Sequence, residues 1–139
     1  MRKLLTGIVV VLVISCAKPT DAMVQSISGY WNIDKVELSD GSDREFPFSN
    51  HMDHFAINDT QGVKNRVSPT YDGKFINYAS PVPFKWEERG GKLFLLFNDG
   101  TAKFEQQVID ANEETMELLH ENGTRYFYKR YSNKEFVNP

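Results

Sequence analysis

Four turn signals constrain the fold of this chain more than any other feature of its sequence. Each is a pair of residues that tolerates positive φ angles, which two-residue β-hairpin turns require. The pairs are Asp72-Gly73, Gly90-Gly91, Asp99-Gly100 and Asn122-Gly123. The segments between them are short, contain many aromatic residues and show no convincing helical period. The chain from residue 27 onward is therefore predicted to be all-β, with each strand antiparallel to the next.

The predicted strands form a continuous meander. They cover residues 28–38, 51–58, 63–71, 74–78, 84–89, 92–98, 101–110, 115–121 and 124–131. An open meander exposes a hydrogen-bonding edge on each side, and closure into a barrel removes both edges. We therefore expect an antiparallel β-barrel of about eight to nine strands. A two-layer β-sandwich is the alternative fold.

The turns also predict which side chains share a face, because a two-residue turn fixes the pairing of its strands. Gly90-Gly91 should pair Trp86 with Leu95, and Asp99-Gly100 should pair Leu95 with Phe104. The predicted inner face contains Phe84, Trp86, Leu93, Leu95, Phe97 and Phe104.

The two remaining turns give predictions of the same kind. Asp72-Gly73 should bring four residues to one face: Val67, Pro69, Ile76 and Tyr78. Asn122-Gly123 should place Leu118 opposite Phe127 on the inner face of the barrel. Three basic residues then share that face: His120, Arg125 and Lys129.

The N-terminal residues have the order of a secretory signal. Arg2 and Lys3 precede an apolar run from Leu4 to Ile14, and Ser15-Cys16 follows. The run is too short to span a bilayer as a helix. This order resembles the lipobox of bacterial lipoproteins, which implies that Cys16 carries acyl chains such as palmitate and becomes the mature N-terminus. Two or more acyl chains anchor a protein stably to a membrane.

The expected organisation of the chain follows from this signal. We predict a signal peptide at residues 1–15, a lipidated tether at 16–26, a barrel domain at 27–131 and a C-terminal tail at 132–139. By resemblance to enterobacterial sorting, Ala17 in place of an aspartate favours the outer membrane. The segment from residue 17 to 22 lacks an acidic cluster, which favours the periplasmic side of that membrane.

Two motifs in the domain resemble lipocalins. Gly29-Tyr30-Trp31 at the start of the first strand matches the Gly-x-Trp of that family. Residues 124–131 resemble the closing strand of lipocalin-like lipoproteins that are common in Bacteroidetes. The resemblance implies that a late basic residue packs on the tryptophan where the barrel closes. The expected closing signature is Gly29, Trp31, Lys129 and Arg130.

A ligand site is expected in the mouth of the barrel. The candidate ligand-binding residues are Trp86, Leu95, Phe104, Gln106, His120 and Arg125. The apolar part of a small amphipathic molecule would lie among the aromatic residues, with its head group near His120 and Arg125. Basic side chains of this kind bind carboxylate or phosphate groups. In the alternative reading, His120 and Arg125 lie at the rim with their polar ends in water.

A filled barrel is the second possibility. Large inward side chains such as Trp31, Phe55 and Phe97 can occupy the interior, since a barrel of about eight strands holds little more than its own side chains. The protein would then present its loops and the outward-facing Phe94 and Leu96 to another envelope protein.

Other sequence patterns disfavour several classes of function. Removal of the signal leaves 14 of the 16 basic residues against 19 acidic residues, which disfavours nucleic-acid binding. His51 and His54 lie three residues apart and would point to opposite faces of a strand, so no metal site is predicted. The adjacent carboxylates of Glu87-Glu88 and Glu113-Glu114 are separated in the same way. We therefore expect a protein that is not an enzyme and has no cofactor.

Overall fold

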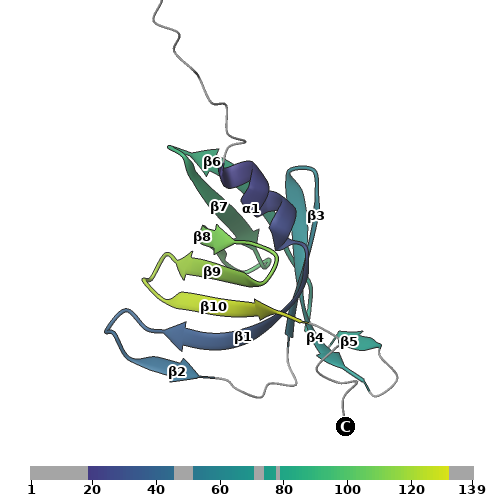
Figure 1. Ribbon diagram of the computed structural model, residues 1–139. Coiled ribbons are helices and arrows are strands. Elements are labelled where there is room, and N and C mark those ends of the chain that lie inside the picture. The colour runs from purple at the N-terminus through teal and green to yellow at the C-terminus, as the bar shows by residue number, and fades with distance from the viewer. Residues whose placement is uncertain (1–18, 46–51, 71–73, 78, 132–139) are drawn as a thin grey trace, which may run out of the picture.

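The computed structural model describes residues 19–45, 52–70, 74–77 and 79–131. These residues form one helix and a sheet of ten strands (Figure 1). The elements are α1 (Pro19–Ile27), β1 (Gly29–Glu37), β2 (Asp43–Glu45), β3 (Met52–Asn58), β4 (Gln61–Pro69), β5 (Phe75–Asn77), β6 (Val82–Arg89), β7 (Lys92–Asn98), β8 (Lys103–Ala111), β9 (Thr115–His120) and β10 (Arg125–Arg130).

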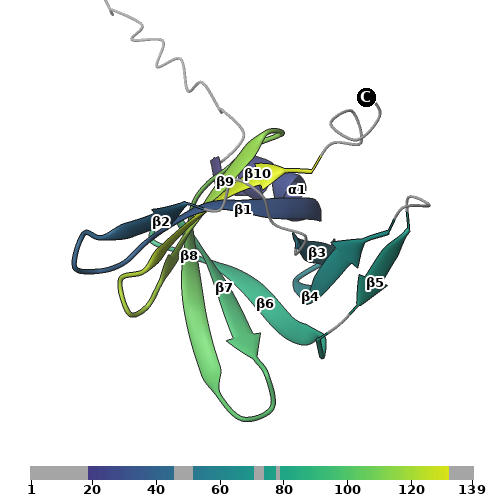
Figure 2. The same cartoon turned by 90° about the horizontal axis from the view of Figure 1, so that it is seen from below.

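Eight of the strands close into an antiparallel barrel. The ring runs through β1, β3, β4, β6, β7, β8, β9 and β10, and it closes because β10 pairs with β1. The two short strands lie outside the ring, β2 paired with β1 and β5 paired with β4 (Figure 2). The prediction of an all-β barrel is therefore confirmed, and the sandwich is not the fold.

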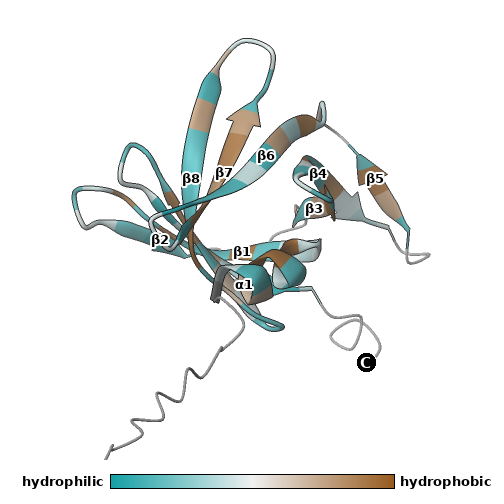
Figure 3. Ribbon diagram, turned by 90° about the horizontal axis from the view of Figure 1, so that it is seen from above, coloured by the Kyte–Doolittle hydropathy of each residue, from teal (hydrophilic) through white to brown (hydrophobic). Residues whose placement is uncertain are grey.

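Alternation along the strands fills the interior with apolar side chains. The fully buried members include Trp31, Phe55, Leu93, Leu95 and Leu118. Strand β7 is apolar on both faces, since Phe94 and Leu96 alternate with its core residues (Figure 3). These side chains fill the part of the barrel interior where they lie, as the filled-barrel alternative predicts.

Helix α1 lies across one end of the barrel (Figure 1). It contacts β3 and β8, and its last residue, Ile27, is fully buried in the core. Thr20 Oγ1 at its start donates to a Glu88 carboxylate oxygen on β6 at 2.9 Å. Residues 19–26 were predicted to belong to a flexible tether, but Met23, Val24 and Ile27 share one apolar face that the barrel end covers.

The pairings of β6, β7 and β8 test two of the predicted turns. Trp86 pairs with Leu95 as predicted. The pairing of Leu95 with Phe104 is wrong, because Phe104 lies opposite Phe97 instead. The loop contains four residues, 99–102, and the Asp99 carboxylate accepts hydrogen bonds from the backbone N–H groups of residues 101 and 102. A shift of two residues leaves every side chain on its predicted face.

The β9–β10 pairing is shifted by one residue from its prediction. This shift moves each side chain of β10 to the opposite face of the sheet. Three residues, 121–123, separate His120 from Thr124, and Gly123 has a φ of 91°. Leu118 therefore lies opposite Tyr126 rather than Phe127. Because successive side chains alternate between faces, Phe127, Arg125 and Lys129 point away from the interior.

The β4–β5 pairing is also shifted by one residue. Ile76 lies opposite Ser68 rather than Pro69 and is 57% exposed. The prediction that Ile76 shares a face with Val67 and Pro69 is therefore wrong. Tyr78 and the predicted Asp72-Gly73 turn lie outside the described residues.

Candidate functional site

The barrel closes around Trp31 and Arg130. These residues are direct partners in the β1–β10 pairing, and the guanidinium carbon lies 4.2 Å from the indole ring centre. Trp31 is fully buried, and its Nε1–H donates to the Ile27 carbonyl oxygen at 2.8 Å. The expectation that a late basic residue packs on Trp31 is confirmed for Arg130. Lys129 faces outward and pairs with Asp34 at 3.4 Å.

Arg130 also fastens the helix to the loop between β8 and β9. Its guanidinium donates to the carbonyl oxygens of Ser26, Ser28, Asn112 and Glu113. Gly29 adopts a φ of 141°, and a Cβ atom there would collide with the guanidinium. Burial lowers the pKa of Arg130, with Glu113 acting in the opposite direction. Gly29, Trp31 and Arg130 thus contact one another at the point where β1 and β10 close the barrel.

Four of the predicted ligand residues come together on the inner face of β7, β8 and β9. Leu95 pairs with Gln106, and Gln106 pairs with His120. The Gln106 amide nitrogen lies 3.1 Å from His120 Nδ1. The Phe104 ring is tilted beside the His120 ring, with 5.3 Å between their centres.

The other two predicted ligand residues lie elsewhere. Arg125 points outward and donates to Glu117 at 3.0 Å. The prediction that Arg125 shares a face with His120 is wrong, because the three-residue loop turns β10 over. Trp86 packs against the core from β6, and its Nε1–H donates to the Asp59 carbonyl oxygen at 2.7 Å. Lys129, which was predicted to share this face, also points outward, away from His120.

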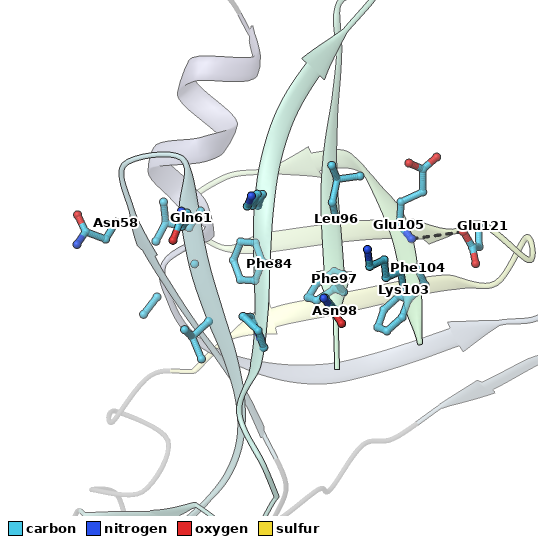
Figure 4. Close-up of a pocket in the computed structure, with 16 residues that line it drawn as sticks. Asn58, Gln61, Phe84, Leu96, Phe97, Asn98, Lys103, Phe104, Glu105 and Glu121 are labelled. Atoms are coloured by element: carbon cyan, nitrogen blue, oxygen red, sulfur yellow. Dashed lines mark hydrogen bonds between the residues drawn. The ribbon is translucent and has the colours of Figure 1, made fainter. Parts of the chain in front are cut away.

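An open groove of about 910 Å³ crosses β3, β4, β6, β7 and β8. It follows one row of paired residues, Gly62, Phe84, Phe97 and Phe104 (Figure 4). The residues beside this row alternate with core positions and face outward: Ala56, Val63, Pro83, Lys85, Leu96 and Glu105. The groove therefore lies on the wall of the barrel, and most of its side chains belong to the outer face.

The groove combines apolar and charged side chains. Leu96 on β7 lies between its cross-strand partners Lys85 and Glu105. Lys103 and Glu121 lie at the β8 side (Figure 4). A side chain at Gly62 would collide with the Phe84 ring, so this glycine lets the ring cross its strand. The arrangement suits a molecule that is largely apolar and carries a polar end.

A second polar region lies inside the barrel, and the sequence did not predict it. Asp53 is only 1% exposed, and its carboxylate accepts hydrogen bonds from the Tyr128 hydroxyl at 3.0 Å and from Arg66 Nε at 3.3 Å. Lys64 Nζ lies 3.6 Å from the same carboxylate. Burial, followed by the Asp53 charge, raises the pKa of Tyr128 well above 10, so the hydroxyl stays protonated. The alternation of Gly62, Lys64 and Arg66 along one face is the only sequence signal for this region.

The predicted absence of a metal site concerns the start of β3. His51 lies outside the described residues. His54 faces outward and stacks on Tyr30 with 4.2 Å between ring centres, and burial lowers its pKa. Within the described ranges, no three histidine, cysteine, aspartate or glutamate side chains come together as metal ligands do.

Comparison with protein families identifies the domain. Residues 27–118 match the lipocalin-like domain, which is about two thirds of the chain. This protein belongs to the lipocalin-like domain family. The match begins at the end of α1 and covers the strands from β1 to most of β9. It includes every groove residue except Glu121, and it includes Asp53, Lys64 and Arg66 of the interior polar region but not Tyr128.

Solved structures similar to this lipocalin-like protein have low sequence identity to it. A lipocalin-like protein from Bacteroides uniformis is 12% identical with a TM-score of 0.49, covering 76% of this chain and 99% of its own. An uncharacterized protein from Bacteroides eggerthii is 11% identical with a TM-score of 0.48, over the same shares. Lobster apocrustacyanin A1 is 12% identical with a TM-score of 0.45, covering 81% of this chain and 66% of its own. No curated protein matches the chain.

In the part of this lipocalin-like chain that the structure describes, no helix is both long and apolar enough to cross a bilayer.

Proposed function

We propose that this lipocalin-like protein binds a small apolar or amphipathic molecule in the groove on the barrel wall, while a lipid on Cys16 holds it at a membrane. The groove is the observation that carries the proposal. Its volume of about 910 Å³ lies in the range of small-molecule sites, roughly 300–1,000 Å³. The packing of the barrel interior also favours a site on the wall, because fully buried side chains such as Leu95 and Phe55 belong to the core inside the barrel.

The order of residues at the N-terminus supports the membrane anchor. The basic Arg2-Lys3, the apolar run and Ser15-Cys16 follow one another as in bacterial lipoproteins. On this proposal the protein resides in the bacterial cell envelope, at the outer membrane and facing the periplasm. An anchored binding protein next to lipid would meet apolar molecules at high local concentration.

The proposed role is non-enzymatic and needs no cofactor. The carboxylates that the sequence places side by side, in Glu87-Glu88 and Glu113-Glu114, are strand or loop neighbours rather than a facing pair. Arg89 pairs with Glu87 at 2.7 Å and with Glu105 at 2.6 Å on the outer surface. Such exposed ion pairs contribute little to stability.

Binding to another envelope protein is the second candidate. It is favoured by the filled interior and by the outward Phe94 and Leu96 on β7. Arg89 covers Phe94, with its guanidinium carbon 4.0 Å from the ring centre, whereas Leu96 lines the groove. A protein partner and a small molecule would therefore compete for the same residues.

The groove is tested by replacing Leu96 with arginine. A buried leucine side chain contributes about 1.5–3 kcal/mol, so Leu96→Arg should weaken binding of an apolar fluorescent probe by about tenfold or more. Ile76→Arg is the matched control, since it also replaces an apolar strand residue with arginine but lies outside the groove. Equal probe affinities for both variants and the original protein would rule the groove out. Native mass spectrometry of protein released from its own membrane separates a bound small molecule from a bound protein.

A further inference from the structure

Helix α1 is fixed to the barrel at its first turn and at its last residue. Near its start, the buried Thr20 donates from Oγ1 to Glu88 on β6 at 2.9 Å. At its end, Ile27 is fully buried, and its carbonyl oxygen accepts a hydrogen bond from Trp31 Nε1 at 2.8 Å. The helix therefore has a fixed place on the barrel, and so does the point at which the chain enters the domain.

This point of entry belongs to one end of the barrel. Glu88, the partner of Thr20, lies next to the β6–β7 turn (Figure 1). Arg130 donates both to the Ser26 carbonyl oxygen of α1 and to the Glu113 carbonyl oxygen in the β8–β9 loop. The β6–β7 turn, the β8–β9 loop and α1 thus form one end, here called the helix end. Because β6 to β10 are antiparallel to one another in turn, the β7–β8 and β9–β10 loops lie at the opposite end, here called the loop end.

The chain between this helix and the proposed lipid is short. Ala17 and Lys18 separate Cys16 from Pro19, the first residue of α1. Three fully extended residue steps span at most about 11 Å. The head-group layer on each side of a bilayer is about 5–8 Å thick, and a lipid-modified cysteine lies at its inner boundary because its acyl chains occupy the hydrocarbon core. Most of the available length is therefore used within the head groups, and the start of α1 is held at the membrane surface.

The exposed side chains of the helix end are polar. Asp21 and Gln25 lie on the free face of α1, Glu113 and Glu114 on the β8–β9 loop, and Lys92 after the β6–β7 turn. The apolar face of α1 is covered by the barrel, so this helix does not insert among acyl chains as an interfacial amphipathic helix does. Among these five residues the acidic ones outnumber the lysine, so attraction to anionic lipid does not hold this end at the membrane. The surface fits hydrated head groups, and the tether holds it there.

We propose that the protein stands on the membrane surface with its helix end against the lipid head groups and its loop end directed into the aqueous phase. This inference rests on the proposed lipid on Cys16. Strand β7, residues 92–98, separates the two ends by about 20 Å along the strand, or about 15 Å along the axis of a barrel whose strands tilt by roughly 40°. The groove reaches the loop end at Asn98 and Lys103, so this part of it opens away from the bilayer.

Fluorophores at two matched lysines test this orientation. Cys16 is the single cysteine of the chain, so a cysteine introduced elsewhere is the only reactive thiol of the lipidated protein. Lys92→Cys places the label at the helix end and Lys103→Cys places it at the loop end, and each lysine is the exposed first residue of its strand. In phosphatidylcholine vesicles with a nitroxide on the lipid head group, quenching should be several-fold stronger at residue 92 than at residue 103. An unchanged melting temperature of both labelled variants excludes unfolding as the cause.

A longer tether tests the cause of the orientation. Insertion of about ten glycine and serine residues after Ala17 adds about 17 Å of average reach and should make quenching at the two positions nearly equal. A difference that persists with the long tether would overturn the tether as its cause.

The same experiment separates this inference from the proposed anchor. Equal quenching at residues 92 and 103, or stronger quenching at residue 103, in protein that is membrane-bound and labelled by palmitate would overturn the orientation and leave the anchor intact. Protein that is neither labelled by palmitate nor bound to the vesicles would overturn the anchor, and the orientation with it.

Discussion

Arg130 holds three segments together where the barrel closes. Its guanidinium lies over Trp31 and donates to carbonyl oxygens at the end of α1 and in the loop before β9. A planar guanidinium can make several such bonds in fixed directions, which a lysine ammonium cannot. Arg130 therefore joins the helix, the first strand and the β8–β9 loop through one side chain.

Replacement of Arg130 by methionine should destabilise the protein more than the same change at its neighbour. Hydrogen bonds from a charged donor contribute about 1.5–3 kcal/mol, so Arg130→Met should lower the free energy of unfolding by about that amount. Lys129→Met is the control, because Lys129 makes an exposed ion pair with Asp34, worth about 0–1 kcal/mol. Urea unfolding followed by tryptophan fluorescence measures both values. Equal losses would show that Arg130 is not the closing residue.

At the scale of elements, the hairpin loops decide which face each strand presents. The Gly90-Gly91 turn has two residues and keeps its predicted pairing. The loop before β10 has three residues, and this single extra residue moves Arg125 from the interior to the surface. Loop length is thus as important to the site as the residues on the strands.

Gly123 should be the least replaceable glycine of these loops. It has a φ of 91°, and a Cβ atom would lie 2.9 Å from the Ser39 side chain in the β1–β2 loop. Gly123→Ala should cost about 1–3 kcal/mol of stability through backbone strain and additionally displace Ser39. Gly100→Ala, with a φ of 93° and open space around it, isolates the backbone contribution. Thermal unfolding compares the two, and an equal shift in melting temperature would exclude the Ser39 contact as a cause.

For the whole molecule, the proposed anchor and the barrel would have separate roles. The barrel supplies the groove and the interior polar region, both from described residues. The proposed lipid on Cys16 determines only where they are presented. Helix α1 begins at Pro19, shortly after this cysteine in the sequence, so few residues separate the proposed lipid from the folded domain.

Substitution of Cys16 by serine should release the protein from the membrane. Without a thioether the chain keeps no acyl groups, and stable anchoring needs two or more. Membrane fractionation and labelling with palmitate measure the change, and probe binding by the released protein should remain. Ser15→Ala is the matched control and should stay membrane-bound. Unchanged labelling of Cys16→Ser would refute the anchor.

The sequence alone determined the all-β class, the barrel and the closing contact of Trp31 with a late basic residue. The all-β class and the barrel follow from turn chemistry and from alternation, which act between residues close in the chain. The closing contact was implied by the resemblance of Gly29-Tyr30-Trp31 and of residues 124–131 to lipocalins. Only the tertiary structure decided the outward position of Arg125 and the meeting of Asp53 with Tyr128, which are 75 residues apart. The physical reason is that contacts across a barrel depend on the exact loop lengths and stagger of all its strands, and one extra loop residue reverses a face.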